Sequence, residues 1–168
     1  MPTSHITPEM LSAVGREISW RVSFPITASD IRRWAVAVYY PDDPPAAFWR
    51  ASHARGAAND EIQVPEEFNP FAWGSAEQSP SREAADGSVE ATLHIDPPNL
   101  EFVLNGGMEC DYGLRMRVGD VMRSVIRLHS YRERRGRLGL MLFTTTEDTW
   151  TNQDGYVVKT VRQTHIRY

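Results

Sequence analysis

The chain has 168 residues, enough for one domain with a buried core, and 41% of them are hydrophobic, as in ordinary soluble globular proteins. The formal net charge of −4, with arginines scattered along the chain, gives no basic face, so we expect no nucleic-acid partner. The single cysteine, Cys110, cannot form an internal disulfide, and no apolar run approaches the roughly 20 residues of a membrane span. The N-terminus lacks a signal-peptide pattern. We therefore expect a cytoplasmic protein with no membrane partner.

The first 40 residues predict two helices and one strand. A short helix is expected at Thr7 to Leu11, because threonine caps a helix and proline suits its first position. Val14 to Phe24 alternates loosely and predicts a strand. Thr27 to Tyr39 predicts the clearest helix, since apolar residues recur there at helical spacing, and Pro41 must end it.

The middle of the chain is rich in proline and polar residues. Val64 to Trp73 brings large apolar side chains back. Pro65 followed by two acidic residues suits a helix start, although Pro70 must shorten or kink that helix. Residues 74–100 are mostly polar and indicate a flexible flap within the single domain 1–168. Val89 to Ile95 is expected to be a short extended piece.

The last third of the chain predicts an antiparallel meander of four strands. It starts near Leu104 and continues through Val121–Arg132, Leu138–Trp150 and Tyr156–Ile166. Val118-Gly119-Asp120 and Asn152-Gln153-Asp154-Gly155 are typical turns. Such a sheet offers one face to a helix, so the fold class is α+β.

Few residues carry recognisable chemistry. No phosphate loop, dinucleotide fingerprint or nucleophile elbow is present, and the five histidines lack metal-ligand spacing, so we expect no metal. Asp42 and Asp43 form either a general acid/base pair or, more simply, a solvated turn between prolines. Cys110 is interpreted as a small hydrophobic residue of a strand rather than a nucleophile.

Asn105-Gly106-Gly107 leaves two interpretations open. The segment is either a simple strand start or bulge, or a place where a ligand comes close to the backbone.

The order of several segments resembles the MaoC-like dehydratases and (R)-specific enoyl-CoA hydratases, and more narrowly the non-catalytic, N-terminal-type half of their two-part enzymes. The segments are Leu104–Gly107, Arg117–Asp120, Tyr131–Gly136 and Thr151–Gly155, with Val64–Phe68 where such proteins begin their central helix. The resemblance implies the hot-dog fold, a long curved antiparallel sheet wrapped around a central helix, and dimers whose sheets join.

The same resemblance implies an activity. Such enzymes bind an acyl thioester, on coenzyme A or acyl carrier protein, at the dimer seam. They add water to a trans-2-enoyl thioester or remove it, with no cofactor of their own. Catalytic members carry Asp-x-Asn-Pro-x-His after the first helix, and the aspartate and histidine hold the water and move protons.

This chain departs from that motif. Alignment on Pro45 puts Asp42 at the aspartate and Ala47 at the histidine, whereas alignment on Pro44 puts Pro41 and Ala46 there. An alanine cannot move a proton. We therefore expect the partner chain of a heterodimeric or heterotetrameric hydratase, one that needs a catalytic MaoC-like subunit and shapes the acyl pocket.

Several residues are candidates for contact with the substrate. Asn105, Gly106 and Gly107 are expected to approach the thioester or its pantetheine arm. The aromatic residues Trp34, Phe48, Phe71 and Trp73 line the acyl pocket or simply pack the core. Two alternatives stay open: a self-sufficient homodimeric thioesterase or hydratase using Asp42 or Asp43, and a non-enzymatic module that binds an acyl ligand. A fatty, sterol-derived or aromatic acyl group is compatible with the sequence.

Overall fold

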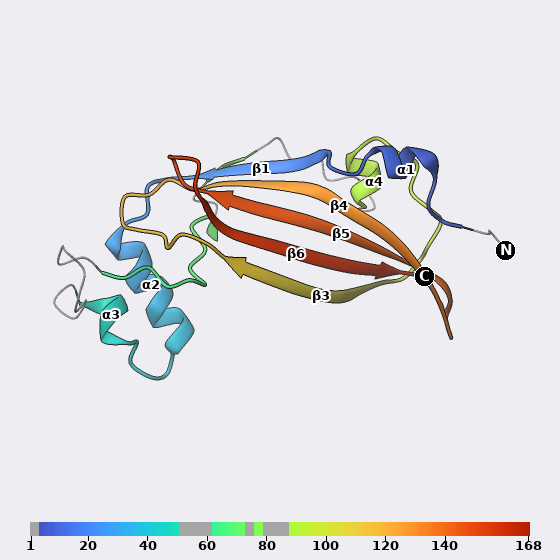
Figure 1. Ribbon diagram of the computed structural model, residues 1–168. Coiled ribbons are helices and arrows are strands. Elements are labelled where there is room, and N and C mark those ends of the chain that lie inside the picture. The colour runs from blue at the N-terminus through green and yellow to red at the C-terminus, as the bar shows by residue number, and fades with distance from the viewer. Residues whose placement is uncertain (1–3, 51–61, 73–75, 79–87) are drawn as a thin grey trace.

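One antiparallel sheet organises the chain (Figure 1). The computed structural model describes residues 4–50, 62–72, 76–78 and 88–168. In chain order the elements are α1 (Pro8–Ser12), β1 (Glu17–Ser23), α2 (Ala28–Tyr39), α3 (Ala46–Trp49), β2 (Ala76–Gln78), α4 (Val89–Thr92), β3 (Val103–Tyr112), β4 (Arg123–Gly136), β5 (Gly139–Thr151) and β6 (Val157–Arg167).

The sheet has the strand order β2-β1-β4-β5-β6-β3, and every neighbouring pair is antiparallel. The four predicted C-terminal strands are therefore confirmed. The first strand is shorter than its predicted range, because Val14 and Gly15 belong to a turn in which Gly15 has a positive φ of 87°. β3 forms one edge of the sheet, and the short β2 forms the other.

The two faces of the sheet differ because side chains alternate along each strand. One face, here called the helix face, carries Leu142 and Trp150 of β5. At one end Leu142 packs with α1 and with the chain after α4, and at the other Trp150 packs in a cluster with Ile31 of α2. Figure 1 shows the same division, with α1 and α4 at one end and α2 and α3 at the other. The opposite face, here called the open face, carries Phe143 and Thr145.

The helix α2 forms as its sequence predicts. The Thr27 hydroxyl accepts a hydrogen bond from the Asp30 amide at 3.2 Å, and the Asp30 carboxylate accepts one from the Thr27 amide at 3.2 Å. This capping box satisfies amides at the start of the helix that have no partner within it. Ile31 and Ala35 are fully buried, so the apolar side of α2 covers its end of the sheet.

Two local predictions are wrong. Val64–Phe68 is a turn rather than a helix start, closed by a 3.1 Å bond from the Phe68 amide to the Pro65 carbonyl. Pro70 lacks an amide hydrogen and prevents a helix from continuing, while Val64 and Phe68 stay buried. Val89–Thr92 is the helix α4 rather than an extended piece, because the Ser88 hydroxyl caps it by accepting the Ala91 amide.

The turn segments named in the resemblance interlock at one end of the sheet. Asp120 accepts hydrogen bonds from the Arg117 amide at 2.8 Å and the Gln153 side chain at 3.1 Å. The Gln153 carbonyl oxygen in turn accepts the Val121 amide at 3.1 Å. These residues stabilise the turns before β4 and after β5, so their part in the molecule is structural. No described helix has the length and apolar character needed to cross a membrane.

Candidate functional site

The segment between α2 and α3 carries the predicted acid pair. Asp42 and Asp43 are both exposed, and the Asp42 amide donates to the Tyr39 carbonyl at 2.7 Å. Neither carboxylate has an ion pair or hydrogen bond within the described part of the chain. General acid/base catalysis requires a positioned group that hands the proton on. The described residues provide no such partner for either aspartate.

The Asn105-Gly106-Gly107 segment forms a bulge in β3. The register between β3 and β6 shifts between Asn105 and Gly107, and the Asn105 side-chain oxygen accepts the Gly107 amide at 3.0 Å. A Cβ at Gly106 would lie 2.9 Å from Cγ1 of Ile166 and 3.0 Å from the Thr164 carbonyl oxygen. Gly107 has a φ of +121°, which favours glycine. The bulge interpretation is confirmed, and the approach of a ligand stays a prediction.

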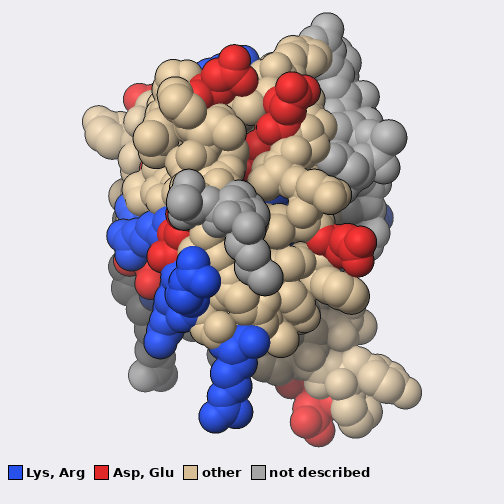
Figure 2. Space-filling model, turned by 90° about the vertical axis from the view of Figure 1, so that its right-hand side faces the viewer, with Lys and Arg blue, Asp and Glu red and all other residues tan. Residues whose placement is uncertain are grey.

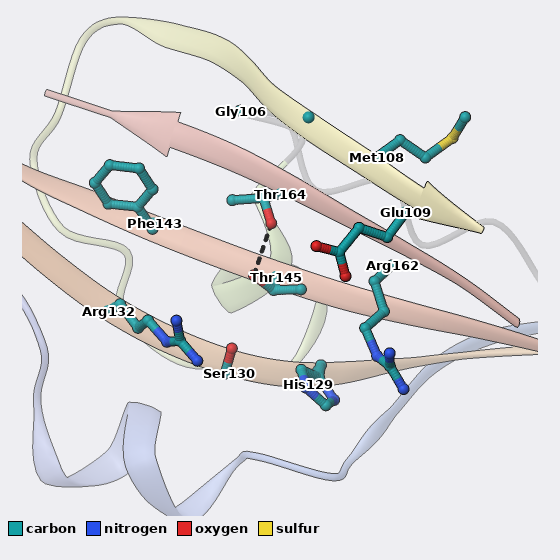
Figure 3. A pocket seen from close by; sticks show the side chains of 11 residues that line it. Gly106, Met108, Glu109, His129, Ser130, Arg132, Phe143, Thr145, Arg162 and Thr164 are labelled. Carbon is teal, nitrogen blue, oxygen red and sulfur yellow. Dashed lines mark hydrogen bonds between the residues drawn. The ribbon is translucent and has the colours of Figure 1, made fainter. Parts of the chain in front are cut away.

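Both glycines also border a pocket on the open face (Figure 3). Its volume is about 430 Å³, within the range of roughly 300–1,000 Å³ that small-molecule sites occupy. β3 forms the rim, and β4, β5 and β6 supply Arg132, Phe143 and Arg162. The pocket therefore combines backbone, an aromatic ring and charged groups in one concave surface.

The charges in this pocket are not equivalent. Arg162 is held by Glu147, with 2.7 Å from Nε to Oε2, and by Asp111 at 3.5 Å. His129 lies 3.7 Å from the same Glu147 carboxylate. Arg132 has neither an ion pair nor a hydrogen bond to another described residue. It is thus the pocket's uncompensated cation.

A single chain does not bring the two predicted site regions together. The loop with Asp42 and Asp43 lies at the α2 end of the sheet, whereas Gly106 and Gly107 lie in the first half of β3, toward the other end (Figure 1). Neither aspartate lines the open-face pocket. A reaction site that used both regions would need two chains.

The three described aromatic candidates lie in or against the core. Phe71 is 6% exposed, packs edge-on against Trp150 with 5.0 Å between ring centroids, and has the Arg21 guanidinium 4.7 Å from its own centroid. Trp34 and Phe48 are half-buried against the same cluster. Trp73 lies outside the described residues. Contact of Phe71 or Trp73 with an acyl group stays a prediction.

Two polar networks on the helix face, one partly buried and one buried, were not predicted from the sequence. In the first, Asp148 accepts bonds from the Ser124 hydroxyl at 2.6 Å, the Trp150 indole at 2.8 Å and Arg21 at 3.2 Å. The sequence shows polar residues on each of these strands, but it does not show which of them meet across the sheet. These donors hold Asp148 as a structural acceptor.

The second network joins α4 to β6. Arg167 donates to the fully buried Glu90 carboxylate at 2.6 Å and to the Thr144 hydroxyl at 3.0 Å. Burial raises the pKa of the Tyr131 hydroxyl, and the nearby Glu90 charge raises it further. The sequence did not indicate that Glu90 is buried, because its partner Arg167 is 77 residues away and the neighbouring residues in the chain are mostly polar.

Neither a metal centre nor a reactive thiol emerges from the geometry. No group of three or more His, Cys, Asp or Glu side chains in the described ranges is arranged to hold a metal ion. Cys110 is half-buried on β3, and burial raises the pKa of its thiol, although the Lys159 ammonium opposes that shift. A thiol of this kind is protonated at neutral pH and is a poor nucleophile.

Comparison with known proteins decides the family. A family model described as "FAS1-like, dehydratase domain region" matches residues 12–161. The chain belongs to this dehydratase family. No curated protein sequence matches it significantly.

Solved structures share the fold of this dehydratase-region chain at low sequence identity. The HadBC (3R-hydroxyacyl-ACP dehydratase) complex from Mycobacterium tuberculosis matches with a TM-score of 0.56 and 20% identity, over 90% of this chain and 96% of that one. The ChsH1-ChsH2 complex from the same organism matches with a TM-score of 0.62 and 15% identity, over 89% of this chain and 82% of that one. A MaoC-like dehydratase from Rhodospirillum rubrum matches with a TM-score of 0.55 and 15% identity, over 93% of this chain and 92% of that one. The expected hot-dog fold and MaoC-like resemblance are confirmed.

Proposed function

We propose that this chain is the non-catalytic subunit of an enoyl-thioester hydratase, equally a 3-hydroxyacyl-thioester dehydratase, whose partner supplies the catalytic aspartate and histidine. The loop after α2 carries this proposal. It has alanine at the histidine position in both alignments, and its two aspartates are exposed without a described partner. Without the histidine, this loop lacks one member of the pair that holds the water and moves protons in catalytic members.

The edge strand β3 supports a partner chain. Among the described strands, β3 pairs only with β6, and its outward backbone groups can pair with another strand. Apolar side chains are exposed along it, including Met108 at 67%, Val103 at 61% and Leu104 at 48%. Exposed apolar surface next to an unpaired edge is typical of an interface. Two of the similar structures, HadBC and ChsH1-ChsH2, are themselves complexes.

Joining through β3 would also bring the two site regions together. If two hot-dog chains pair these edges antiparallel, the first half of one β3 lies beside the end of the other. The loop after α2 lies near that end of the sheet (Figure 1). The glycine bulge at Gly106 and Gly107 would then approach the partner's catalytic loop. This arrangement explains how two regions that are remote within one chain serve one site.

The division of labour follows from these positions. The substrate is an acyl thioester on coenzyme A or acyl carrier protein. The partner's aspartate and histidine hold the water, remove one of its protons as the oxygen bonds to the β-carbon, and deliver a proton to the α-carbon; loss of water is the reverse. This chain contributes the glycine backbone along the thioester and a wall of the acyl pocket. No cofactor is needed for addition or loss of water.

The test is hydration of crotonyl-CoA by the purified chain, alone and after co-purification with a MaoC-like chain that carries Asp-x-Asn-Pro-x-His. We expect no turnover by either chain alone and turnover by the complex. Replacing the partner's motif histidine with alanine should abolish the turnover of the complex. Robust turnover by this chain alone, lost in Asp42→Ala or Asp43→Ala, would contradict the proposal. Release of free thiol would identify a thioesterase instead.

A further inference from the structure

The open-face pocket contains one cation that the chain leaves uncompensated. Arg132 is exposed on β4 and has no ion-pair partner among the described residues, whereas Arg162 across the pocket is bound by Glu147 and Asp111. Figure 3 shows the two guanidinium groups in different parts of the pocket. An anion entering this pocket would therefore meet an available guanidinium at Arg132.

The surroundings of Arg132 suit a ligand that has both a charged head and an uncharged arm. Phe143 is its direct cross-strand neighbour, and Ser130 lies two residues earlier on the same face with a hydroxyl that no described residue binds. Gly107 on the rim has open space where a Cβ would point. A ligand arm can thus lie on an aromatic ring and against bare backbone while its head binds Arg132 and Ser130.

The opposite part of the pocket limits the charge that a ligand can carry. The Glu109 carboxylate lines the β3 side near Arg162 and away from Arg132 (Figure 3). A second negative group there would be repelled. The pocket therefore favours one anionic head and an uncharged arm.

We propose that this pocket binds an organic anion, a carboxylate or phosphate head on an uncharged arm, with Arg132 as the principal contact. Arginine offers two parallel N–H donors that match either head group. Several arginines follow along the hairpin, Arg134, Arg135 and Arg137, and all are exposed. Figure 2 shows basic side chains that project from this end of the molecule, on a face that also carries acidic ones. One chain supplies the whole lining of the pocket, and Arg132, Ser130 and Phe143 have no part in the proposed reaction, which shares only the glycine rim with this site.

Calorimetric titration of the whole chain with four probes tests the ligand class. Octanoate and 4′-phosphopantetheine carry a head and an arm, whereas octanol and inorganic phosphate each lack one of them. We expect at least one of the first two to bind about tenfold or more tightly than both of the others. Octanoate alone would identify a free carboxylate, and 4′-phosphopantetheine alone would identify a carrier arm. Equal binding of inorganic phosphate, or no binding of either full probe, would overturn the proposal.

Matched variants test the location. Arg132→Ala should weaken the affinity for the probe about tenfold or more, because a charge-assisted hydrogen bond is lost. Arg134→Ala is the control, because Arg134 lies on the same strand and face but outside the pocket. Ser130→Phe should also abolish binding by filling the pocket, with thermal melting as a check that the fold persists. Equal losses in Arg132→Ala and Arg134→Ala, or full binding by Ser130→Phe, would show that the pocket is not the site.

Discussion

The ion pair between Glu90 and Arg167 places two charges inside the protein. Their side chains are 0% and 10% exposed, and the shortest distance between them is 2.6 Å. A buried charge is tolerated only while it is paired, and removal of one partner typically costs about 3–5 kcal/mol. Glu90→Gln keeps the shape and removes the charge, so we expect a loss of unfolding free energy of about that size. Urea denaturation measures the change.

Two further variants separate the charge effect from a general effect of the substitution. Glu101→Gln, at an exposed position, should change the unfolding free energy by about 0.5 kcal/mol or less. Glu90→Gln combined with Arg167→Met should recover part of the loss, because no unpaired charge then stays buried. A Glu90→Gln variant as stable as the Glu101→Gln control would show that the pair does not anchor α4.

Tyr131 makes the unfolding free energy of the protein depend on pH in the alkaline range. It is 8% exposed, and burial together with the Glu90 charge raises its pKa above the ordinary value of 10.0. Below that pH the hydroxyl is protonated in both the folded and the unfolded chain and contributes no pH dependence. Above it only the unfolded chain loses the proton, so stability falls by up to about 1.4 kcal/mol per pH unit. Unfolding free energies from about pH 9 to about pH 11 should fall less steeply for Tyr131→Phe. Parallel curves for the two proteins would contradict this assignment.

At the scale of one element, the β3 bulge depends on the absence of a side chain at Gly106. A Cβ there would meet the Thr164 backbone at 3.0 Å, and backbone cannot move aside without separating β3 from β6. Gly106→Ala should therefore destabilise the chain by about 1–3 kcal/mol. Gly136→Ala is the matched control, because its Cβ would meet the flexible end of Met141, at 2.8 Å. Similar melting temperatures for the two variants would rule out a special packing requirement at the bulge.

Periodicity explains which elements were predictable. α2 has apolar residues at helical spacing in its sequence, β4 and β5 have alternating side chains, and Thr27 caps α2 with a local signal. The prediction for Val64–Phe68 failed because a helix-start pattern cannot outweigh the following Pro70 together with burial of Val64 and Phe68 in a turn. The prediction for α4 failed because a helix this short is set by its Ser88 cap and by Glu90, whose partner lies on the last strand.

The candidate site was predictable only in part, for a physical reason. The missing histidine after α2 and the glycines of β3 are local features that a sequence displays. The pocket on the open face is not local, because Arg132, Phe143 and Arg162 come from three strands and meet only through the strand register. Nothing in the sequence shows that Arg162 is paired with Glu147 and Asp111 whereas Arg132 has no such partner among the described residues.

At the scale of the whole molecule, the exposed edge of β3 is the surface on which assembly depends. Leu104 and Met108 are 48% and 67% exposed on this edge strand. A lysine introduced on a sheet edge opposes pairing with another strand, because the charge would be buried at the seam. Leu104→Lys and Met108→Lys should therefore shift the assembled protein toward monomer and abolish co-purification with a partner. Leu138→Lys is the control, since Leu138 is 58% exposed but lies in the β4–β5 turn. Light scattering after size-exclusion chromatography gives the mass of each variant. If Leu138→Lys dissociates the assembly while both β3 variants leave it intact, the interface lies elsewhere and the two site regions are not joined through β3.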